Sequence, residues 1–377
     1  MSKENSAELI DKYLAGKCSE QEKAVLESWY LVNAASATDT LPEPDYVTIE
    51  KEMWPVIERA SNPAVKRRRL WPRIAAAATL LFALSFGFYT YHLRQAWDAE
   101  KRYATNIPPG GSKAYLTLAD GKKISLTDAG NGQIAEQSGN SITKTEDGRL
   151  IYVSSKQAGG AKNTDHLNNT IETPKGGQYQ VQLPDGTKVW LNAATSLSYP
   201  STFALLKDRK VALKGEAYFE VAKDKTRPFI VHADQQDIEV LGTHFNMSVY
   251  PDEPAAKTTL LEGSVKVSVA AEQQILKPGE QAVTLGSRIK ISPADTEQAL
   301  DWKNGDFMFK KESLAEVMRK VSRWYDITVV YEKDVDQLQT FSGLVSRSKN
   351  ISAVLKIMES TGQLRFSITG RKVTVMK

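Results

Sequence analysis

The sequence is poor in the residues that build disulfides and metal centres. Its 377 residues include one cysteine, Cys18, and four histidines, at His92, His166, His232 and His244. One cysteine excludes an internal disulfide, and no group of Cys and His residues has the spacing of a zinc site. We therefore expect no metal and no other cofactor.

Sequence motifs of the common enzyme classes are also absent. There is no GxSxG, no Walker loop for phosphate, no HExxH and no GxGxxG after a predicted strand. Glu216 and Glu220 would share one face of a strand, as a pair of glycosidase carboxylates does, but no second motif supports that chemistry. His232 and His244 fall on separate predicted strands, where hydrogen-bonded sheet residues are the simpler interpretation. The sequence therefore predicts a protein that is not an enzyme.

Charged residues are missing from one long internal run. Residues 74–93 contain no Asp, Glu, Lys or Arg, and a helix of this length rises about 30 Å, the thickness of the hydrocarbon core of a bilayer. A buried helix rarely runs so far without a charge between basic flanks, and a signal peptide lies at the extreme N-terminus. We predict one transmembrane helix over residues 74–93.

The basic residues on either side of this run predict its orientation. Residues 66–73 carry five Lys and Arg, more than the three in residues 94–105. The cytoplasmic side of a membrane protein takes the larger basic excess. We therefore expect residues 1–73 in the cytoplasm, residues 94–105 as a linker, and residues 106–377 across the membrane.

Residues 1–65 are acidic, with twelve Asp and Glu against six Lys and Arg, and predict a small all-α tail. A first amphipathic helix ends at Gly16, and a second begins at a capping box in which Ser19 precedes Glu22 by three residues. The apolar faces hold Leu9, Ile10, Tyr13 and Leu14 in the first helix, and Val25, Leu26, Trp29 and Tyr30 in the second. A third, weaker helical pattern over residues 47–57 is interrupted by Pro55.

Three short helices bury little surface by themselves. Their apolar faces either pack on one another or complete a core with a partner, and the residues alone leave both possibilities open. An acidic helical segment can also cover the DNA-binding surface of a basic protein.

Residues 106–295 have the pattern of an all-β domain, with short alternating apolar runs separated by Gly and Pro. The motif Asp-Gly-x-Lys-(Ile/Val)-x-Leu occurs at Asp120 and again at Asp185, and another Asp-Gly pair follows Glu146. Asp-Gly between alternating apolar runs is a strong hairpin signal. Because the strand unit repeats, we expect a solenoid-like or sandwich-like stack.

Residues 300–377 predict a second domain of a different class. Their pattern reads strand, helix, strand, strand, helix, strand, strand. A capping box at Ser313 begins the first helix, Gly362 follows the second, and the closing hairpin turns at Gly370. This order indicates a compact α+β domain.

Several segments between Thr173 and Val283 resemble FecR-type anti-sigma factors, also called sigma regulators. The matching stretches are TPKGGQYQVQLPDGTKVWLNAATSLSYP, VALKGEAYFEVAKDKTRPFIVHA, EVLGTHFNMSVY, TLLEGSVKVS and LKPGEQAV, in the order and approximate spacing of the family. Residues 300–377 resemble the C-terminal domain of that family, which is itself similar to the short signalling domain of secretins and TonB-dependent transporters. Residues 106–155 are a departure, because this half-repeat precedes the best-matching block.

The resemblance implies a single-pass protein of the bacterial inner membrane, with a cytoplasmic N-terminus and a periplasmic C-terminus. An outer-membrane TonB-dependent transporter would contact the periplasmic part through its signalling domain. The cytoplasmic tail would then control an extracytoplasmic-function sigma factor, often after regulated proteolysis, with no direct contact to nucleic acid. The expected sigma-factor-binding residues are Leu9, Tyr13, Leu14, Val25 and Trp29.

A different class of function stays open as the alternative. The chain could be a membrane-anchored periplasmic binding or scaffold protein, one that engages glycans through its β domain by stacking a sugar on Trp190. Its helical tail would then be no more than an anchor, which two well-formed amphipathic helices argue against. The sequence names neither the inducing ligand, the sign of regulation, a cleavage site nor the oligomeric state.

Overall fold

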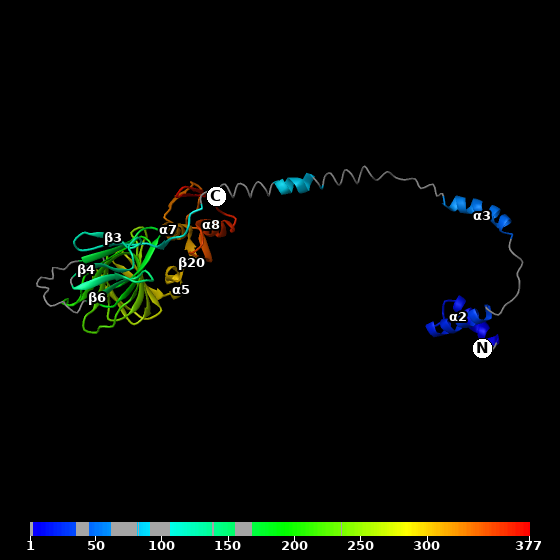
Figure 1. Cartoon of the computed structure of the whole chain (residues 1–377), viewed down its shortest axis with the longest axis horizontal. Helices are drawn as coiled ribbons and strands as arrows, with labels where there is room; N and C mark the ends of the chain where they lie inside the picture. Colours follow the sequence, from blue (N-terminus) through cyan, green and yellow to red (C-terminus); the bar gives the residue numbers. More distant parts are fainter. Residues whose placement is uncertain are drawn as a thin grey trace. The chain divides into compact units, whose positions relative to one another are not determined.

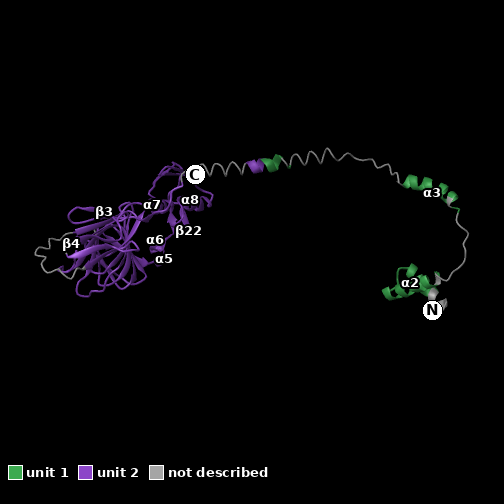
Figure 2. Ribbon diagram, in the orientation of Figure 1, with its two compact units in different colours: residues 1–86 green, residues 87–377 purple. Residues whose placement is uncertain are grey.

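The computed structural model describes residues 3–34, 45–61, 81, 83–90, 106–137, 139–154, 168–234 and 236–377. The chain forms two compact units, Met1–Phe86 and Gly87–Lys377 (Figure 1, Figure 2). The first is helical and the second is mostly β, in agreement with the expectation of a predominantly β chain with a small helical N-terminal part.

The first unit contains helices α1 (Lys3–Leu14), α2 (Glu20–Ala34) and α3 (Tyr46–Ser61). Gly16 follows α1 with a φ of 69°, a left-handed conformation that glycine adopts without strain. The capping box at α2 forms as predicted: the Ser19 amide donates to Glu22 Oε2 at 2.8 Å, and the Glu22 amide donates to Ser19 Oγ at 3.3 Å. Each of these bonds satisfies an amide that the first turn of α2 would otherwise leave without a partner.

Helix α3 is longer than its sequence pattern predicts and runs through Pro55 without a break. Asp45 begins it, because its carboxylate accepts hydrogen bonds from the Val47 and Thr48 amides at 3.2 and 3.3 Å. A proline inside a helix lacks one backbone donor and crowds the preceding turn, at a cost of about 3 kcal/mol. The predicted interruption of the helix at Pro55 is therefore wrong. The energetic cost of a proline inside a helix, on which that prediction was based, still applies to α3.

The structure corrects the predicted transmembrane fold class. Within the ranges that it describes, no helix is both long and apolar enough to cross a membrane. Of residues 74–93, it describes residue 81 and the helical residues 83–90, which rise about 12 Å against the roughly 30 Å of a hydrocarbon core. The other residues of that range lie outside the described part. The single-pass placement in a bacterial inner membrane, with a cytoplasmic N-terminus and a periplasmic C-terminus, depended on this helix and is not supported.

The β-rich part of the second unit is a sandwich of two sheets. The first sheet has the order β3-β2-β7-β10-β11-β12-β13-β16-β17, and the second has the order β4-β5-β6-β8-β9-β11-β14-β15-β18-β19. A short strand, β1, adds to the second sheet in parallel with β8. From β12 onward, successive strand pairs alternate between the two sheets, so the stack is both sandwich-like and solenoid-like.

The strands of the first sheet are β2 (Tyr115–Thr117), β3 (Lys123–Ser125), β7 (Asn168–Thr173), β10 (Thr195–Pro200), β11 (Arg209–Glu220), β12 (Phe229–Ala233), β13 (Gln236–Val240), β16 (Val265–Val269) and β17 (Glu272–Leu276). Those confined to the second sheet are β1 (Gly111–Ser112), β4 (Gly132–Gln137), β5 (Asn140–Lys144), β6 (Leu150–Ser154), β8 (Gly177–Gln182), β9 (Lys188–Leu191), β14 (His244–Val249), β15 (Ala256–Glu262), β18 (Glu280–Leu285) and β19 (Arg288–Pro293).

Strand β11 belongs to both sheets and changes from one to the other near Gly215. Its N-terminal part pairs with β10 and β12, and its C-terminal part pairs with β9 and β14. Gly215 has a φ of 100°, and a Cβ there would lie 2.5 Å from Thr195 Oγ1. Only glycine fits such a bend, because any side chain would meet both backbone strain and a steric clash.

The predicted Asp-Gly hairpins are confirmed. Asp120 lies between β2 and β3, Asp147 between β5 and β6, and Asp185 between β8 and β9. The β2–β3 hairpin lies in the first sheet and the β8–β9 hairpin in the second. The repeated motif therefore encodes a local turn, and its two copies do not stack as equivalent layers.

The C-terminal part follows the strand and helix order expected from the sequence. Two one-turn helices, α5 (Thr296–Ala299) and α6 (Asp301–Asn304), lead into β20 (Asp306–Ser313), α7 (Leu314–Tyr325), β21 (Thr328–Tyr331), β22 (Thr340–Ser346), α8 (Ile351–Glu359), β23 (Arg365–Thr369) and β24 (Lys372–Met376). Strands β20 and β22 pair with each other, and β24 lies between β21 and β23. The apolar faces of α7 and α8 supply much of a core separate from that of the sandwich.

Candidate functional site

The predicted sigma-factor-binding residues lie on a helical hairpin made by α1 and α2. Lys12 Nζ lies 3.6 Å from Glu22 Oε1, and the Cys18 thiol donates to the Leu9 carbonyl oxygen at 3.6 Å. Of the predicted residues, Leu9 and Trp29 are half-buried, whereas Tyr13, Leu14 and Val25 are exposed. The hairpin therefore leaves a large part of its apolar surface uncovered within the unit.

Leu14 is the clearest example of this exposure. Its side chain is 78% exposed, although leucine is among the residues most often found inside proteins. Only Leu26 is a buried apolar side chain among the residues of the first unit whose burial is described. The possibility that these faces merely pack on one another does not account for Tyr13, Leu14 and Val25.

Helix α3 adds an exposed apolar surface that was not predicted from the sequence. Its exposed large apolar side chains are Val47, Ile49, Met53, Trp54, Val56 and Ile57. The expected interruption at Pro55 hid this surface, because a broken helix would not present these residues together. The high density of apolar residues between Val47 and Ile57 is the feature of the sequence that indicates this surface.

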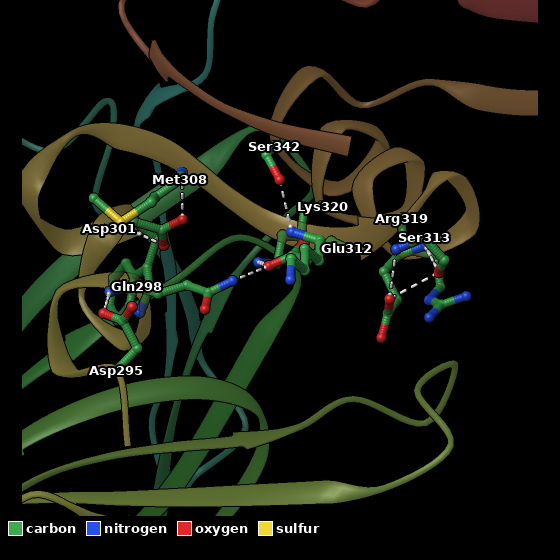
Figure 3. Close-up of polar contacts among 12 residues, drawn as sticks. Asp295, Gln298, Asp301, Met308, Glu312, Ser313, Arg319, Lys320 and Ser342 are labelled. Carbon is green, nitrogen blue, oxygen red and sulfur yellow. Dashed lines mark hydrogen bonds and ion pairs between the residues drawn. The ribbon is translucent and has the colours of Figure 1, made fainter. Parts of the chain in front are cut away.

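A second candidate site is a cavity of about 500 Å³ within the second unit. It lies between the outer face of the second sheet, helices α5 to α7 and strand β20, and its lining includes Glu216, Asp301, Glu312 and Lys320. Figure 3 shows how closely the polar contacts of α5, β20 and α7 are grouped there. The Lys320 ammonium contacts Glu312 Oε1 at 2.6 Å, and Gln298 Nε2 donates to the same oxygen at 2.5 Å.

Burial sets the protonation of the groups around this cavity. It raises the pKa of Asp301 to about 6, although the carboxylate accepts hydrogen bonds from the Met308 and Trp302 amides. Burial lowers the pKa of Lys320, but the carboxylates of Glu312 and Asp301 outweigh it, so the net pKa is raised. Burial lowers the pKa of Arg347 to about 10, which still leaves it charged near neutral pH.

Charged side chains hold the sandwich and the C-terminal domain together. On α7, Arg323 contacts the Asp252 carboxylate at 3.0 Å and Glu253 Oε1 at 2.8 Å, and its guanidinium lies 3.9 Å from the centre of the Tyr250 ring. Arg347 donates to Asn192 Oδ1 at 3.0 Å and stacks on Trp324. Because Arg323 and Arg347 are both nearly inaccessible to solvent, these contacts fix the two folded parts against each other.

The residues considered for catalysis or metal binding have structural partners. Glu216 accepts hydrogen bonds from Asn192 and Asn246, and Glu220 lies 3.8 Å from Lys188 Nζ. His232 and His244 lie on strands of different sheets, next to Asp237 and Glu262. Trp190 packs against Tyr218 and under the Lys303 ammonium. The described residues contain no group of three or more His, Cys, Asp or Glu that could hold a metal ion.

Two protein-family models match parts of this chain. The model described as FecR protein matches residues 169–266, and the model described as FecR, C-terminal matches residues 306–375. Two crystal structures of a candidate anti-sigma factor from Parabacteroides distasonis ATCC 8503 share 29% sequence identity with the chain, with TM-scores of 0.52 and 0.53. They cover 55% and 56% of this chain and 98% and 99% of their own. No curated protein matches.

Residues 169–266 and 306–375 thus match the FecR family in the order expected from the sequence. The resemblance to FecR-type proteins expected from the sequence is confirmed. The half-repeat before the family match is an integral extension of the sandwich, because β2 pairs with β7 and β6 pairs with β8.

Proposed function

We propose that this chain is an anti-sigma regulator that binds an extracytoplasmic-function sigma factor through α1 and α2, and that its C-terminal domain receives a signal from an outer-membrane TonB-dependent transporter. Both steps are binding events, and we assign no catalysis to the chain. The observation that carries the proposal is the exposed apolar surface of the α1–α2 hairpin, within a chain whose other unit buries most of its apolar residues in two cores.

The chemistry of this hairpin suits a large, partly apolar protein partner. Amphipathic helices bind by placing their apolar face in a hydrophobic groove, and aromatic side chains usually dominate the binding energy. Tyr13 on α1 and Tyr30 on α2 are exposed, and Trp29, the residue before Tyr30, is half-buried. The acidic excess of residues 1–65 favours association with a basic protein that itself binds DNA.

The sigma-factor step can be tested with one charge placed on the hairpin. In the full-length chain, Leu14→Glu should weaken binding to the sigma factor encoded nearest to it by at least about tenfold, because a buried, unpaired carboxylate in an apolar interface is costly. Leu205→Glu is the matched control, since Leu14 and Leu205 are each 78% exposed. Equal affinities of the two variants, measured by titration calorimetry, would contradict the assignment of this surface.

The transporter step rests on the free strand edges of the C-terminal domain. In the three-stranded sheet, β24 is central, so β21 and β23 are edge strands to which an extended segment of a partner can add. Val330 on β21 is exposed, and a lysine there would discourage strand addition, as lysines do on natural edge strands.

We expect Val330→Lys to reduce capture of the transporter's signalling domain by the full-length chain. Ile275→Lys is the control, because Ile275 is also an exposed apolar residue on an edge strand, β17 of the first sheet. If both variants capture the signalling domain as well as the unsubstituted chain, the β21 edge is not the docking site. If both lose it, the effect is not specific to the C-terminal domain.

A further inference from the structure

The segment by which the chain enters the sandwich runs first through the C-terminal domain. We call residues 107–113 the strap. Ile107, at its start, is 4% exposed and belongs to the same hydrophobic cluster as Trp324, Ile351 and Val354. Apart from Ala193, the other buried members of this cluster lie at Phe307 or beyond, at least 200 positions along the chain, so Ile107 is an anchor that holds its segment in place.

The strap also completes a helix of the C-terminal domain. The cap residue of α8, Asn350, makes no side-chain hydrogen bond to the first turn. The Ile351 amide donates instead to the carbonyl oxygen of Ile107 at 3.0 Å. Because the first amides of a helix need partners from outside it, the strap supplies the partner of the first amide of α8.

Beyond its anchor, the strap passes under the ring of Trp324 and joins the second sheet. A Cβ on Gly110 would lie 2.8 Å from both the Trp324 ring and the Gly176 carbonyl oxygen, so the strap fits only with glycine there. The Gly111 amide then donates to Gly176, and the Lys113 amide donates to Gln178 at 3.2 Å. The strap is therefore held at one end by the C-terminal domain and at the other by β8.

The two folded parts have contacts that do not involve the strap. The Gly176 amide donates to the Arg323 carbonyl oxygen at 2.7 Å, Trp302 Nε1 donates to Asn246 Oδ1 at 3.2 Å, and Arg323 pairs with Asp252 and Glu253. These contacts would hold the sandwich and the C-terminal domain together if the strap left its position.

We propose that the strap is a latch: the C-terminal domain holds the chain at Ile107, and a partner that docks on this domain acts on the N-terminal helices by releasing the strap. The latch itself stands on the contacts above, and only the identity of the partner rests on the proposed function. Release would free the Ile351, Gly111 and Lys113 amides together, since all three take part in holding the strap.

Neighbouring glycines offer a matched pair of variants. Gly110→Ala should expel the strap by the clash with Trp324, whereas Gly111→Ala has no atom within 4 Å of the added Cβ and no left-handed φ, so it should leave the strap seated. In hydrogen exchange of the full-length protein, we expect Gly110→Ala to speed exchange at Ile351 and Lys113 at least about tenfold. Amides of β24 and β16 should stay protected in both variants.

Ile107→Ala is a second, milder variant that keeps the proposal testable if Gly110→Ala fails to fold. It should accelerate the same amides, because it removes the anchor without adding a clash. Exchange at Ile351 and Lys113 that is no faster in either variant than in Gly111→Ala would overturn the latch. Loss of protection across β24 and β16 as well would also overturn it, since the strap would then be part of the general fold.

The effect of strap release on regulation is tested by a separate measurement. With the strap released, sigma-dependent transcription should no longer depend on the inducing signal in Gly110→Ala cells, whereas Gly111→Ala cells should respond normally. If exchange shows release but transcription still follows the signal, the coupling is overturned. A failure of the proposed function would be distinguishable, because Leu14→Glu and Leu205→Glu would then bind the sigma factor equally.

Discussion

The helices of the first unit and the fold of the second place their apolar residues in opposite ways. In the second unit, two continuous clusters bury aromatic and aliphatic side chains from almost every strand and helix. In α1, α2 and α3, residues of the same types, such as Leu14 and Trp54, lie in contact with solvent. The described helices of the first unit thus leave exposed the kind of apolar surface that in other proteins marks interaction sites.

This contrast predicts very different costs for the same tryptophan substitution. Trp324 is 5% exposed and donates to the Arg347 carbonyl oxygen at 2.9 Å, whereas Trp54 on α3 is 63% exposed. Trp324→Ala should lower the free energy of unfolding of the second unit by about 3–5 kcal/mol, because it leaves a cavity and an unpaired carbonyl. Trp54→Ala should change it by less than about 0.5 kcal/mol. Urea unfolding of the full chain measures both.

A large loss of stability in Trp54→Ala would break the comparison, since it would show that α3 is packed in the protein as it exists in solution. A small loss in Trp324→Ala would show instead that the interface between the sandwich and the C-terminal domain contributes little. Either result would require a different division between scaffold and binding surface.

A smaller effect is expected from the buried carboxyl of Asp301. Burial raises its pKa from 3.8 to about 6 in the folded protein, so the folded state takes up a proton more readily than the unfolded state. Stability from this group is therefore greatest below pH 4 and is lost as the pH rises through 6. Lowering the pH from 7 to 5 should stabilise the second unit through Asp301 by about 1 kcal/mol.

The comparison that isolates this effect uses two Asp→Asn variants. Asp301→Asn should abolish that part of the pH dependence, whereas Asp334→Asn, at an exposed position, should retain it. Unfolding free energies at pH 5 and pH 7 give the difference. Equal pH dependence in the two variants would mean that the Asp301 carboxyl is as well solvated as an exposed one.

Local signals in the sequence predicted local structure well. The Asp-Gly turns, the capping boxes at Ser19 and Ser313, and the element order after residue 300 depend on contacts within a few residues, and all of these form. The family resemblance, carried by contiguous motifs, also held. The predicted transmembrane helix was not confirmed. Its prediction used the length of the charge-free run in residues 74–93 and the basic residues on either side, and the structure has no such helix in the part that it describes.

Long-range features could not be predicted in the same way. The division of β11 between two sheets depends on Thr195 approaching Gly215, and the seating of Ile107 depends on a core built mainly from residues after 300. Neither feature leaves a periodic pattern in the sequence. Ile107, which precedes two prolines, cannot be told from a linker residue by its neighbours in the sequence. The candidate site was predicted in part: its helices follow from amphipathic spacing, but which side chains stay exposed depends on how α1 meets α2.

The smallest expected effect comes from a motif that both regions share. Ser19 with Glu22 and Ser313 with Glu316 form capping boxes of nearly equal geometry, with Ser Oγ to Glu Oε2 distances of 2.8 and 2.7 Å. Ser313→Ala should lower the free energy of unfolding of the second unit by about 1 kcal/mol, and Ser313→Gly by only a few tenths, because glycine tolerates the cap conformation.

Ser19→Ala removes the same bonds from a helix that packs on little else. It should reduce helicity at the start of α2, seen by amide exchange at Glu22 and Lys23, while unfolding of the second unit stays unchanged. Because the two boxes match in geometry, any difference between them reports what surrounds each helix. A loss of stability in the second unit on Ser19→Ala would show that the first unit also stabilises the scaffold, and the contrast between the two regions would no longer hold.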